Sequence, residues 1–222
     1  MTETIPHSVQ GAINSTLTRR VFLAGVLTLP AGCNAPGLGA LYAGAYYGPV
    51  INEPFPIAGV DLSGRDPELL RQEVSFSGPY RPGTVVVNVA QRRLYLVQGG
   101  GRALRYGVGV GREEALNFHG SAIIGRKAVW PSWTPTETMI HAMPRYAAYA
   151  GGMPGGIDNP LGARALYLYR DGQDTYFRLH GTTEPETIGT AVSSGCIRLV
   201  NQDVIDLYNR VPLGAPVIVL QD

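Results

Sequence analysis

The chain has 222 residues, of which 45% are hydrophobic, and this composition excludes a wholly disordered protein. Its 18 lysines and arginines face 17 aspartates and glutamates, so the formal net charge is +1 and no basic block can follow a phosphate backbone, which argues against nucleic acid as a partner. The 29 glycines and 17 prolines, with only 16% charged residues, favour one turn-rich β domain with appendages over a bundle of solvated helices.

Residues 1–45 have the pattern of an export signal. Arg19 and Arg20 precede an apolar run at residues 21–32, which is too short to cross a bilayer as a helix, since about twenty residues are needed. The arginine pair resembles the twin-arginine signal, so we predict export to the periplasm or cell envelope. The alternative is a buried helix of the domain, which Pro30 disfavours.

Two sites compete for the end of this signal. Residues 29–33, Leu-Pro-Ala-Gly-Cys, resemble a bacterial lipoprotein cleavage box, which would make Cys33 a lipidated first residue attached to a membrane. Residues 43–45, Ala-Gly-Ala, offer an ordinary cleavage site of small residues. Cys196 is then essentially alone in the folded part of the chain, and such a thiol is inert, bridged to another chain, or retained because it reacts.

Residues 46–81 are predicted to form a tether on the surface of the domain. They are rich in proline and glycine, and no periodic pattern persists through them. A short helix is expected at residues 66–74, with Ser63 or Asp66 near its start and Pro67 in its first turn.

Residues 82–222 are predicted to form a β-rich domain, because short β-type runs alternate with glycine. One helix is expected late in the chain, capped by Asn201, with Asp203 complementing its dipole and an apolar face of Val204, Leu207 and Tyr208. Strands are expected at residues 84–90, 93–98, 103–110, 122–130, 165–169, 175–179 and 216–220.

A long loop at residues 130–163 interrupts the strand pattern and carries four aromatic residues. Loops of this length inside a compact domain are usually functional or disordered. The aromatic residues favour a packed flap over a binding site, and the alternative is a surface insertion without a role. They are Trp130, Trp133, Tyr146 and Tyr149.

His180 and Cys196 are the strongest candidates for catalytic residues. A thiol needs a base to become a nucleophile, and histidine is the side chain best suited to that role near neutral pH. Gly181 and Gly195 permit close backbone approach, and the turn Ser194-Gly195-Cys196 offers backbone N–H groups for an oxyanion hole. The alternative is a buried, inert thiol.

These residues closely resemble the signature of the L,D-transpeptidase family with the YkuD-like catalytic domain. The signature stands here as His180-Gly181 and, further along, Ser193-Ser194-Gly195-Cys196-Ile197-Arg198, and the likeness extends over roughly residues 82–221. The resemblance implies a mainly β fold, an L,D-transpeptidase-like β-sandwich or open barrel with one or two short helices, and no cofactor.

The resemblance also implies a cysteine acyltransferase that acts on peptidoglycan stem peptides. Cys196 would attack the bond between diaminopimelate and D-alanine, release D-alanine, and pass the acyl group to a neighbouring stem as a 3→3 cross-link. His180 would activate the thiol, and the carbonyl of Gly181 would orient the imidazole. Ser194 stands where many members carry histidine. Arg198 suits a substrate carboxylate, and a structural salt bridge is its alternative role.

Several alternatives remain open at this stage. The same thioester chemistry could use water, a free D-amino acid or an amine of an envelope protein as acceptor, or the domain could be a non-catalytic wall-binding module. Carbapenems acylate the thiol in similar enzymes, so a covalent adduct at Cys196 is expected. A zinc site formed by His119, His141, His180 and Cys196 is possible by ligand type, but no two of them have a ligand spacing such as His-x-x-x-His, so no metal site is predicted.

Overall fold

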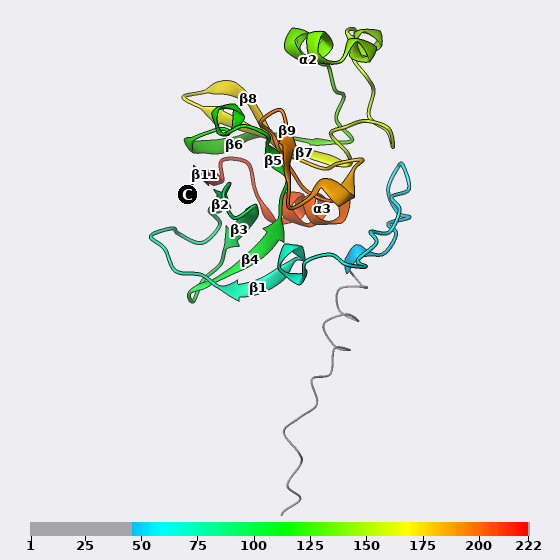
Figure 1. Ribbon diagram of the computed structural model, residues 1–222. Coiled ribbons are helices and arrows are strands. Elements are labelled where there is room, and N and C mark those ends of the chain that lie inside the picture. Colours follow the sequence, from blue (N-terminus) through cyan, green and yellow to red (C-terminus); the bar gives the residue numbers. More distant parts are fainter. Residues whose placement is uncertain (1–45, 222) are drawn as a thin grey trace, which may run out of the picture. The chain divides into compact units, whose positions relative to one another are not determined.

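In a computed structural model, residues 46–221 are described and form a mainly β fold (Figure 1). The predicted signal, with Cys33, lies outside these residues. Within residues 46–221, no helix is long and apolar enough to cross a membrane.

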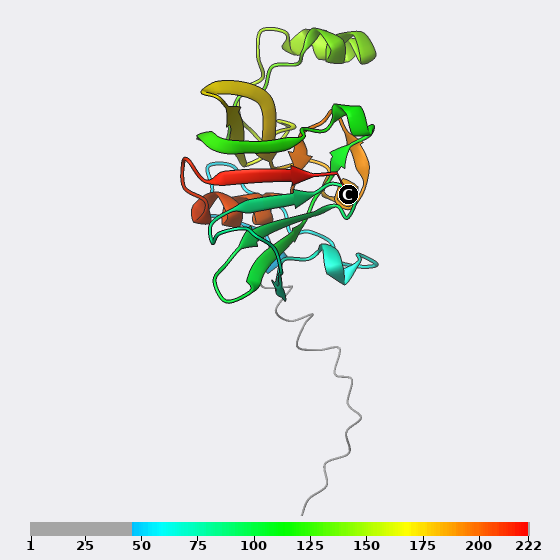
Figure 2. The same ribbon diagram turned by 90° about the vertical axis from the view of Figure 1, so that its left-hand side faces the viewer.

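A nine-stranded mixed sheet forms the centre of the fold, in the order β1-β4-β3-β2-β11-β6-β7-β8-β10. A two-stranded parallel sheet joins β5 and β9. Figure 2 shows β11, in red, between its two neighbours in the large sheet. The strands are β1 (Gln72–Ser75), β2 (Val85–Asn88), β3 (Arg93–Val97), β4 (Arg102–Gly107), β5 (Val110–Gly111), β6 (Gly120–Val129), β7 (Arg164–Arg170), β8 (Gln173–His180), β9 (Ala191–Ser193), β10 (Ile197–Arg198) and β11 (Pro216–Leu220).

Helical segments are few and short in the part of the chain that the structure describes. They are the α-helices α2 (Glu137–Ala142) and α3 (Asn201–Arg210), and the 3₁₀ turns η1 (Pro67–Leu69), η2 (Glu114–Leu116), η3 (Pro144–Tyr149) and η4 (Pro185–Thr187). The predicted mainly β fold with one or two short helices is therefore confirmed.

The core lies where α3 packs against the sheet. Every residue of β2 is buried, and β2 is a central strand that is hydrogen-bonded to β3 on one side and to β11 on the other. From α3, Val204 and Leu207 are fully buried in the same cluster as Leu166 of β7 and Leu179 of β8. This packing holds α3 against β7 and β8, the pair of strands at which the candidate site begins.

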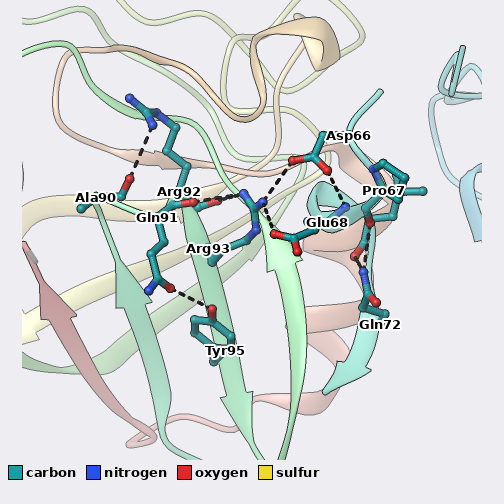
Figure 3. Close-up of polar contacts among 10 residues, drawn as sticks. Asp66, Pro67, Glu68, Gln72, Ala90, Gln91, Arg92, Arg93 and Tyr95 are labelled. Atoms are coloured by element: carbon teal, nitrogen blue, oxygen red, sulfur yellow. Dashed lines mark hydrogen bonds and ion pairs between the residues drawn. The ribbon is translucent and has the colours of Figure 1, made fainter. Parts of the chain in front are cut away.

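Residues 46–71, here called the strap, lie against the domain and contact the start of α3. The Tyr47 hydroxyl donates a hydrogen bond to Asp203 Oδ2 at 3.0 Å, and both side chains are buried. Figure 3 shows the guanidinium of Arg93, on β3, between the carboxylates of Asp66 and Glu68, at 3.3 and 3.4 Å. The boundary between tether and domain near residue 81 remains a prediction. The contacts of Tyr47, Asp66 and Glu68 attach the strap to the domain.

Two helix predictions need correction. The helix expected at residues 66–74 is only the 3₁₀ turn η1, which Asp66 does cap, with its Oδ1 accepting from Glu68 N at 2.8 Å. The chain becomes extended at Leu70, because Gln72–Ser75 pair with β4 instead. Asn201 does not cap α3; Val200 holds the cap position without a side-chain bond, and the Asn201 amide bonds elsewhere.

Candidate active site

Parallel pairing of β10 with β8 brings His180 and Cys196 to neighbouring strand ends. Ile197 pairs with Leu179, and Arg198 pairs with His180, so Cys196 immediately precedes the paired segment. Both side chains line one cavity of about 360 Å³. His180 and Cys196 are distant in the sequence, and the pairing of β8 with β10 brings them to the same cavity.

The imidazole of His180 is buried and held in one orientation. Its Nδ1 lies 2.6 Å from the carbonyl oxygen of Gly181, an acceptor, so Nδ1 carries the proton and Nε2 is left with a lone pair. Burial lowers the pKa of His180 from 6.5 to about 3, and the positive charge of Arg198 adds to this effect. The ring is therefore neutral at physiological pH and can accept a proton.

The Cys196 thiol lies in a partly buried position and is the free cysteine within the described residues. Burial raises the pKa of this thiol above its ordinary value, while the charges of Arg178 and Arg198 oppose the shift. The thiol is consequently protonated at neutral pH, and it needs a base before it can act as a nucleophile.

A bulge in β8 places a backbone carbonyl beside this thiol. The β7–β8 register shifts after Tyr167, which pairs with Arg178. Within the bulge Tyr176 adopts φ 63°, the residue is 79% exposed, and its carbonyl oxygen lies 3.9 Å from Cys196 Sγ. Thr175 Oγ1 donates to Leu168 O at 2.7 Å and stabilises the bulge. The position of the Tyr176 carbonyl beside Cys196 was not predicted from the sequence. The adjacent Asp174 and Thr175, which favour turns, are the sequence signal for an irregularity in this strand.

The turn before Cys196 is held by Ser193. Its hydroxyl donates to Cys196 O at 2.7 Å and accepts from Gly195 N at 3.0 Å. Gly195 has φ 120°, and a Cβ at that position would lie 2.1 Å from Leu116 O, so only glycine fits. The Gly195 N–H is therefore engaged by Ser193 and is not free to bind an oxyanion.

Arg198 lies at the junction of two adjoining cavities. Its Nη1 lies 3.1 Å from Glu184 Oε2, and the Glu184 side chain is 58% exposed. An ion pair this exposed contributes little stability, so a substrate carboxylate could replace Glu184 at low cost. The second cavity measures about 320 Å³ and shares its wall with the first; the shared residues are Trp133, Arg145, Tyr146, Pro160, Glu184 and Arg198.

Residues 130–163, the flap, are organised by one buried asparagine. The Asn159 amide donates to the carbonyls of Pro131, Met153 and Pro154 at 2.9 to 3.2 Å. The Trp133 ring lies 5.1 Å from that of Tyr146, and both rings line the two cavities. Figures 1 and 2 show α2, within the flap, standing away from the sheet. The flap therefore contributes one wall of the cavity that contains Cys196.

His119 and His141 are not brought to this site. Both are exposed, and neither lines the cavity of Cys196. Among residues 46–221, no group of three or more His, Cys, Asp and Glu side chains is arranged to hold a metal ion.

Comparison with known proteins gives consistent family matches. The family profile described as YkuD, L,D-transpeptidase catalytic domain, matches residues 82–219. The probable L,D-transpeptidase YbiS of Escherichia coli strain K12 is 37% identical over 139 residues, which cover 60% of this chain and 43% of that protein. The probable L,D-transpeptidase ErfK/SrfK of the same strain is 36% identical over 151 residues, covering 66% and 46%. The chain thus spans less than half the length of these relatives.

A crystal structure from Brucella melitensis, described as a probable carnitine operon oxidoreductase, is 48% identical and covers 69% of this chain and 95% of that one. Its TM-score is 0.48, so the superposition carries no information on activity. An L,D-transpeptidase from Mycobacterium smegmatis is 16% identical with a TM-score of 0.43, over 61% of this chain and 57% of that one.

Proposed function

The chain belongs to the L,D-transpeptidase family, and from that membership we propose that it is a peptidoglycan L,D-transpeptidase with Cys196 as nucleophile and His180 as base. One observation carries the proposal: the pairing of β10 with β8 places both side chains in a single cavity, with the His180 ring already fixed by Gly181. A nucleophile next to an oriented base is the arrangement that covalent acyl transfer requires.

Acylation begins from an uncharged pair. His180 Nε2 takes the thiol proton while Cys196 Sγ attacks the carbonyl carbon between diaminopimelate and D-alanine. The oxyanion that forms would be stabilised by the backbone N–H groups of Ser194 and Cys196, because the Gly195 N–H is engaged by Ser193. When the C–N bond breaks, the imidazolium returns its proton to the departing amine of D-alanine, and a thioester remains on Sγ.

Deacylation repeats these steps with a different nucleophile. The side-chain amine of a neighbouring stem attacks the thioester, His180 accepts a proton from that amine, and Sγ leaves and is reprotonated. Arg198 binds a carboxylate of the stem peptide by exchanging its contact with Glu184. The adjoining cavity beneath the flap leaves room for a second peptide chain.

The proposed substrate lies outside the cytoplasmic membrane, so the enzyme must be exported. The twin-arginine-like segment at residues 1–45 would provide this export, and lipidation of Cys33 would anchor the product to a membrane. Water, a free D-amino acid or an amine of an envelope protein are the other acceptors that the same thioester chemistry would allow.

The decisive experiment incubates the purified chain with a disaccharide-tetrapeptide and follows the masses of enzyme and products. We expect loss of D-alanine and a dimeric product. Cys196→Ala should abolish both, whereas Cys33→Ala, which removes the other cysteine, should abolish neither. Loss of D-alanine with only a tripeptide would indicate a carboxypeptidase, and the absence of any acyl-enzyme would favour a wall-binding module.

Carbapenem reactivity is a second consequence of the proposed nucleophile. Sγ should open the β-lactam ring and keep the acyl group as a thioester, so the intact mass should rise by one carbapenem per chain. Cys196→Ala should show no increase, and Cys33→Ala should show the full increase. An unmodified mass for the unaltered chain would contradict a reactive Cys196.

A further inference from the structure

Asn201, the first residue of α3, uses its amide to join two loops. Its Nδ2 donates a hydrogen bond to Thr182 O, and its Oδ1 accepts one from Ala163 N, both at 2.9 Å. Asparagine at the start of a helix commonly caps it, but here the cap position belongs to Val200. The amide is therefore committed to contacts outside its own helix.

The two loops joined by this amide are the root of the flap and the loop after His180. Ala163 closes the flap, because its carbonyl accepts from Trp130 N at 2.8 Å where β6 ends and β7 begins. Thr182 follows Gly181, whose carbonyl holds His180 Nδ1. One side chain thus spans from the flap to the backbone segment that orients the candidate base.

Two glycines leave the space that the amide occupies. A Cβ on Gly162 would lie 2.3 Å from Asn201 Oδ1, and a Cβ on Gly181 would lie 2.2 Å from it. Glycine backbone has the widest conformational freedom, so the Gly181 carbonyl needs external restraint to keep one direction. The Gly181 N–H donates to Arg164 O at 3.1 Å and Asn201 Nδ2 donates to Thr182 O, so the peptide that carries the Gly181 carbonyl is restrained on both sides.

We propose that Asn201 is a positioning residue that fixes the Gly181 carbonyl, and through it His180, relative to the root of the flap. The proposal rests on the proposed role of His180 as the base for Cys196. The Asn201 amide bonds to backbone groups of the two loops, Ala163 N and Thr182 O, and it would act on the reaction through His180. Movement of the flap root would therefore reach the base through one amide.

Gln202 provides a matched control at the next position. Its side chain is a buried amide on the same helical turn, and its Nε2 donates to Gly48 O and Ala58 O at 3.1 and 2.9 Å. These bonds anchor the strap and leave the His180 loop untouched. Substitution of Gln202 should lower stability without altering the orientation of the base.

The test measures the rate of alkylation of Cys196 by iodoacetamide between pH 5 and 10, in a Cys33→Ala background so that Cys196 alone reports. His180→Ala defines the profile of an unassisted thiol. Asn201→Ala should lower the rate near pH 7 by about tenfold to a hundredfold, since misplacing a catalytic group by about 1 Å costs this much. At high pH, where thiolate forms without a base, the rate should change little.

Asn201→Asp tests the same contact in a chain that keeps its shape. Asp retains an acceptor for Ala163 N but loses the donor to Thr182 O. Asn201→Asp should therefore show the same lowered alkylation rate near pH 7, and it provides this test if the alanine variant does not fold. Gln202→Ala should keep the profile of the unaltered chain despite a lower melting temperature. The expected result is an altered pH profile of alkylation in both Asn201 variants and an unaltered profile in Gln202→Ala.

Three outcomes would overturn the inference. Asn201 variants with the profile of the unaltered chain would refute the positioning role alone. An equal change in Gln202→Ala would show that the effect is merely structural. If the unaltered chain already has the profile of His180→Ala, then His180 does not assist Cys196, and both the proposed function and this inference fail.

Discussion

His180 and Cys196 are both uncharged in the resting site, because burial lowers the pKa of the imidazole and raises that of the thiol. Their proximity therefore does not produce a preformed ion pair, and the proton must move as the nucleophile attacks. This places the requirement on geometry, since an imidazole that is already neutral is useful only if Nε2 faces the thiol proton. The short contact of Nδ1 with Gly181 O meets half of that requirement.

The depressed pKa of His180 also predicts how stability depends on pH. The pKa is lowered from 6.5 to about 3 on folding, so the unfolded chain binds this proton more readily. The stability that depends on neutral His180 is fully present above pH 6.5 and is lost as the pH falls toward 3. His180→Asn, whose amide can still donate to Gly181 O, should therefore lose less stability than the unaltered chain between pH 7 and 4.

Urea unfolding of both chains at pH 7, 5.5 and 4 measures this difference, which we expect to be on the order of 3 kcal/mol at pH 4. Asp203, whose pKa burial raises to about 7, works in the opposite direction: the stability that comes from its protonated form is lost as the pH rises. It is present in both chains, so its contribution cancels. Identical losses in the two chains would contradict a buried, neutral His180.

At the scale of elements, the sequence predicted the longer strands well and the short ones poorly. Residues 85–88 and 216–220 carry runs of valine and isoleucine, so the predicted strands agree with β2 and β11 to within two residues. The two-residue β10 has no such pattern, yet it aligns Arg198 with His180. It is defined by pairing with a distant strand, which single-sequence periodicity does not contain.

The misplaced helix at residues 66–74 has a related cause. Asp66 and Pro67 do begin a helical turn, but pairing with β4 takes over the following residues. Asn201 was predicted to cap α3 from its local sequence context alone. Its side chain instead bonds to Ala163 N and Thr182 O, which are distant in the sequence. In both cases tertiary contacts override a correct local signal.

The strap is predicted to stabilise α3 through Tyr47. The Tyr47 hydroxyl donates to Asp203 and accepts from Arg71 N at 2.6 Å, so Tyr47→Phe leaves both groups poorly satisfied in a buried position. We expect a loss of about 1–3 kcal/mol in the free energy of unfolding. Tyr46→Phe is the matched control, because Tyr46 is 51% exposed and the ring that Arg71 covers is retained.

Denaturant unfolding of the two phenylalanine variants separates the outcomes. A loss confined to Tyr47→Phe supports an anchored strap. Equal values for the two variants would mean that the strap contributes no stability through this contact.

At the scale of the whole domain, strap, flap and site share the same few anchor points. Glu53 of the strap accepts from Trp130 Nε1 at 2.9 Å and from Arg164 Nη1 at 2.9 Å, so it holds both ends of the flap. The signature predicted the candidate residues His180 and Cys196, which carry recognisable chemistry. It could not predict Glu53, because a single exposed-looking glutamate in a proline-rich segment has no pattern of its own.

Away from its root at Ala163, the flap should act on substrate binding and leave the intrinsic reactivity of the thiol unchanged. Trp133 lines both cavities and packs against Tyr146, so Trp133→Ala removes a wall from the peptide site while leaving His180 and Cys196 in place. The KM for a disaccharide-tetrapeptide should rise about tenfold, which corresponds to about 1.4 kcal/mol of lost contact. The alkylation rate of Cys196 by iodoacetamide, a reagent too small to need the wall, should stay the same.

Ile157→Ala is the control for this prediction, because Ile157 belongs to the flap, is 60% exposed and lines neither of the two cavities. Its KM and alkylation rate should both match those of the unaltered chain. A slower alkylation of Trp133→Ala would mean that the flap positions the catalytic pair as well as the peptide. An unchanged KM would mean that the stem peptide binds outside these two cavities. Trp133 lines both of them, so its removal should weaken the binding of a peptide in either one.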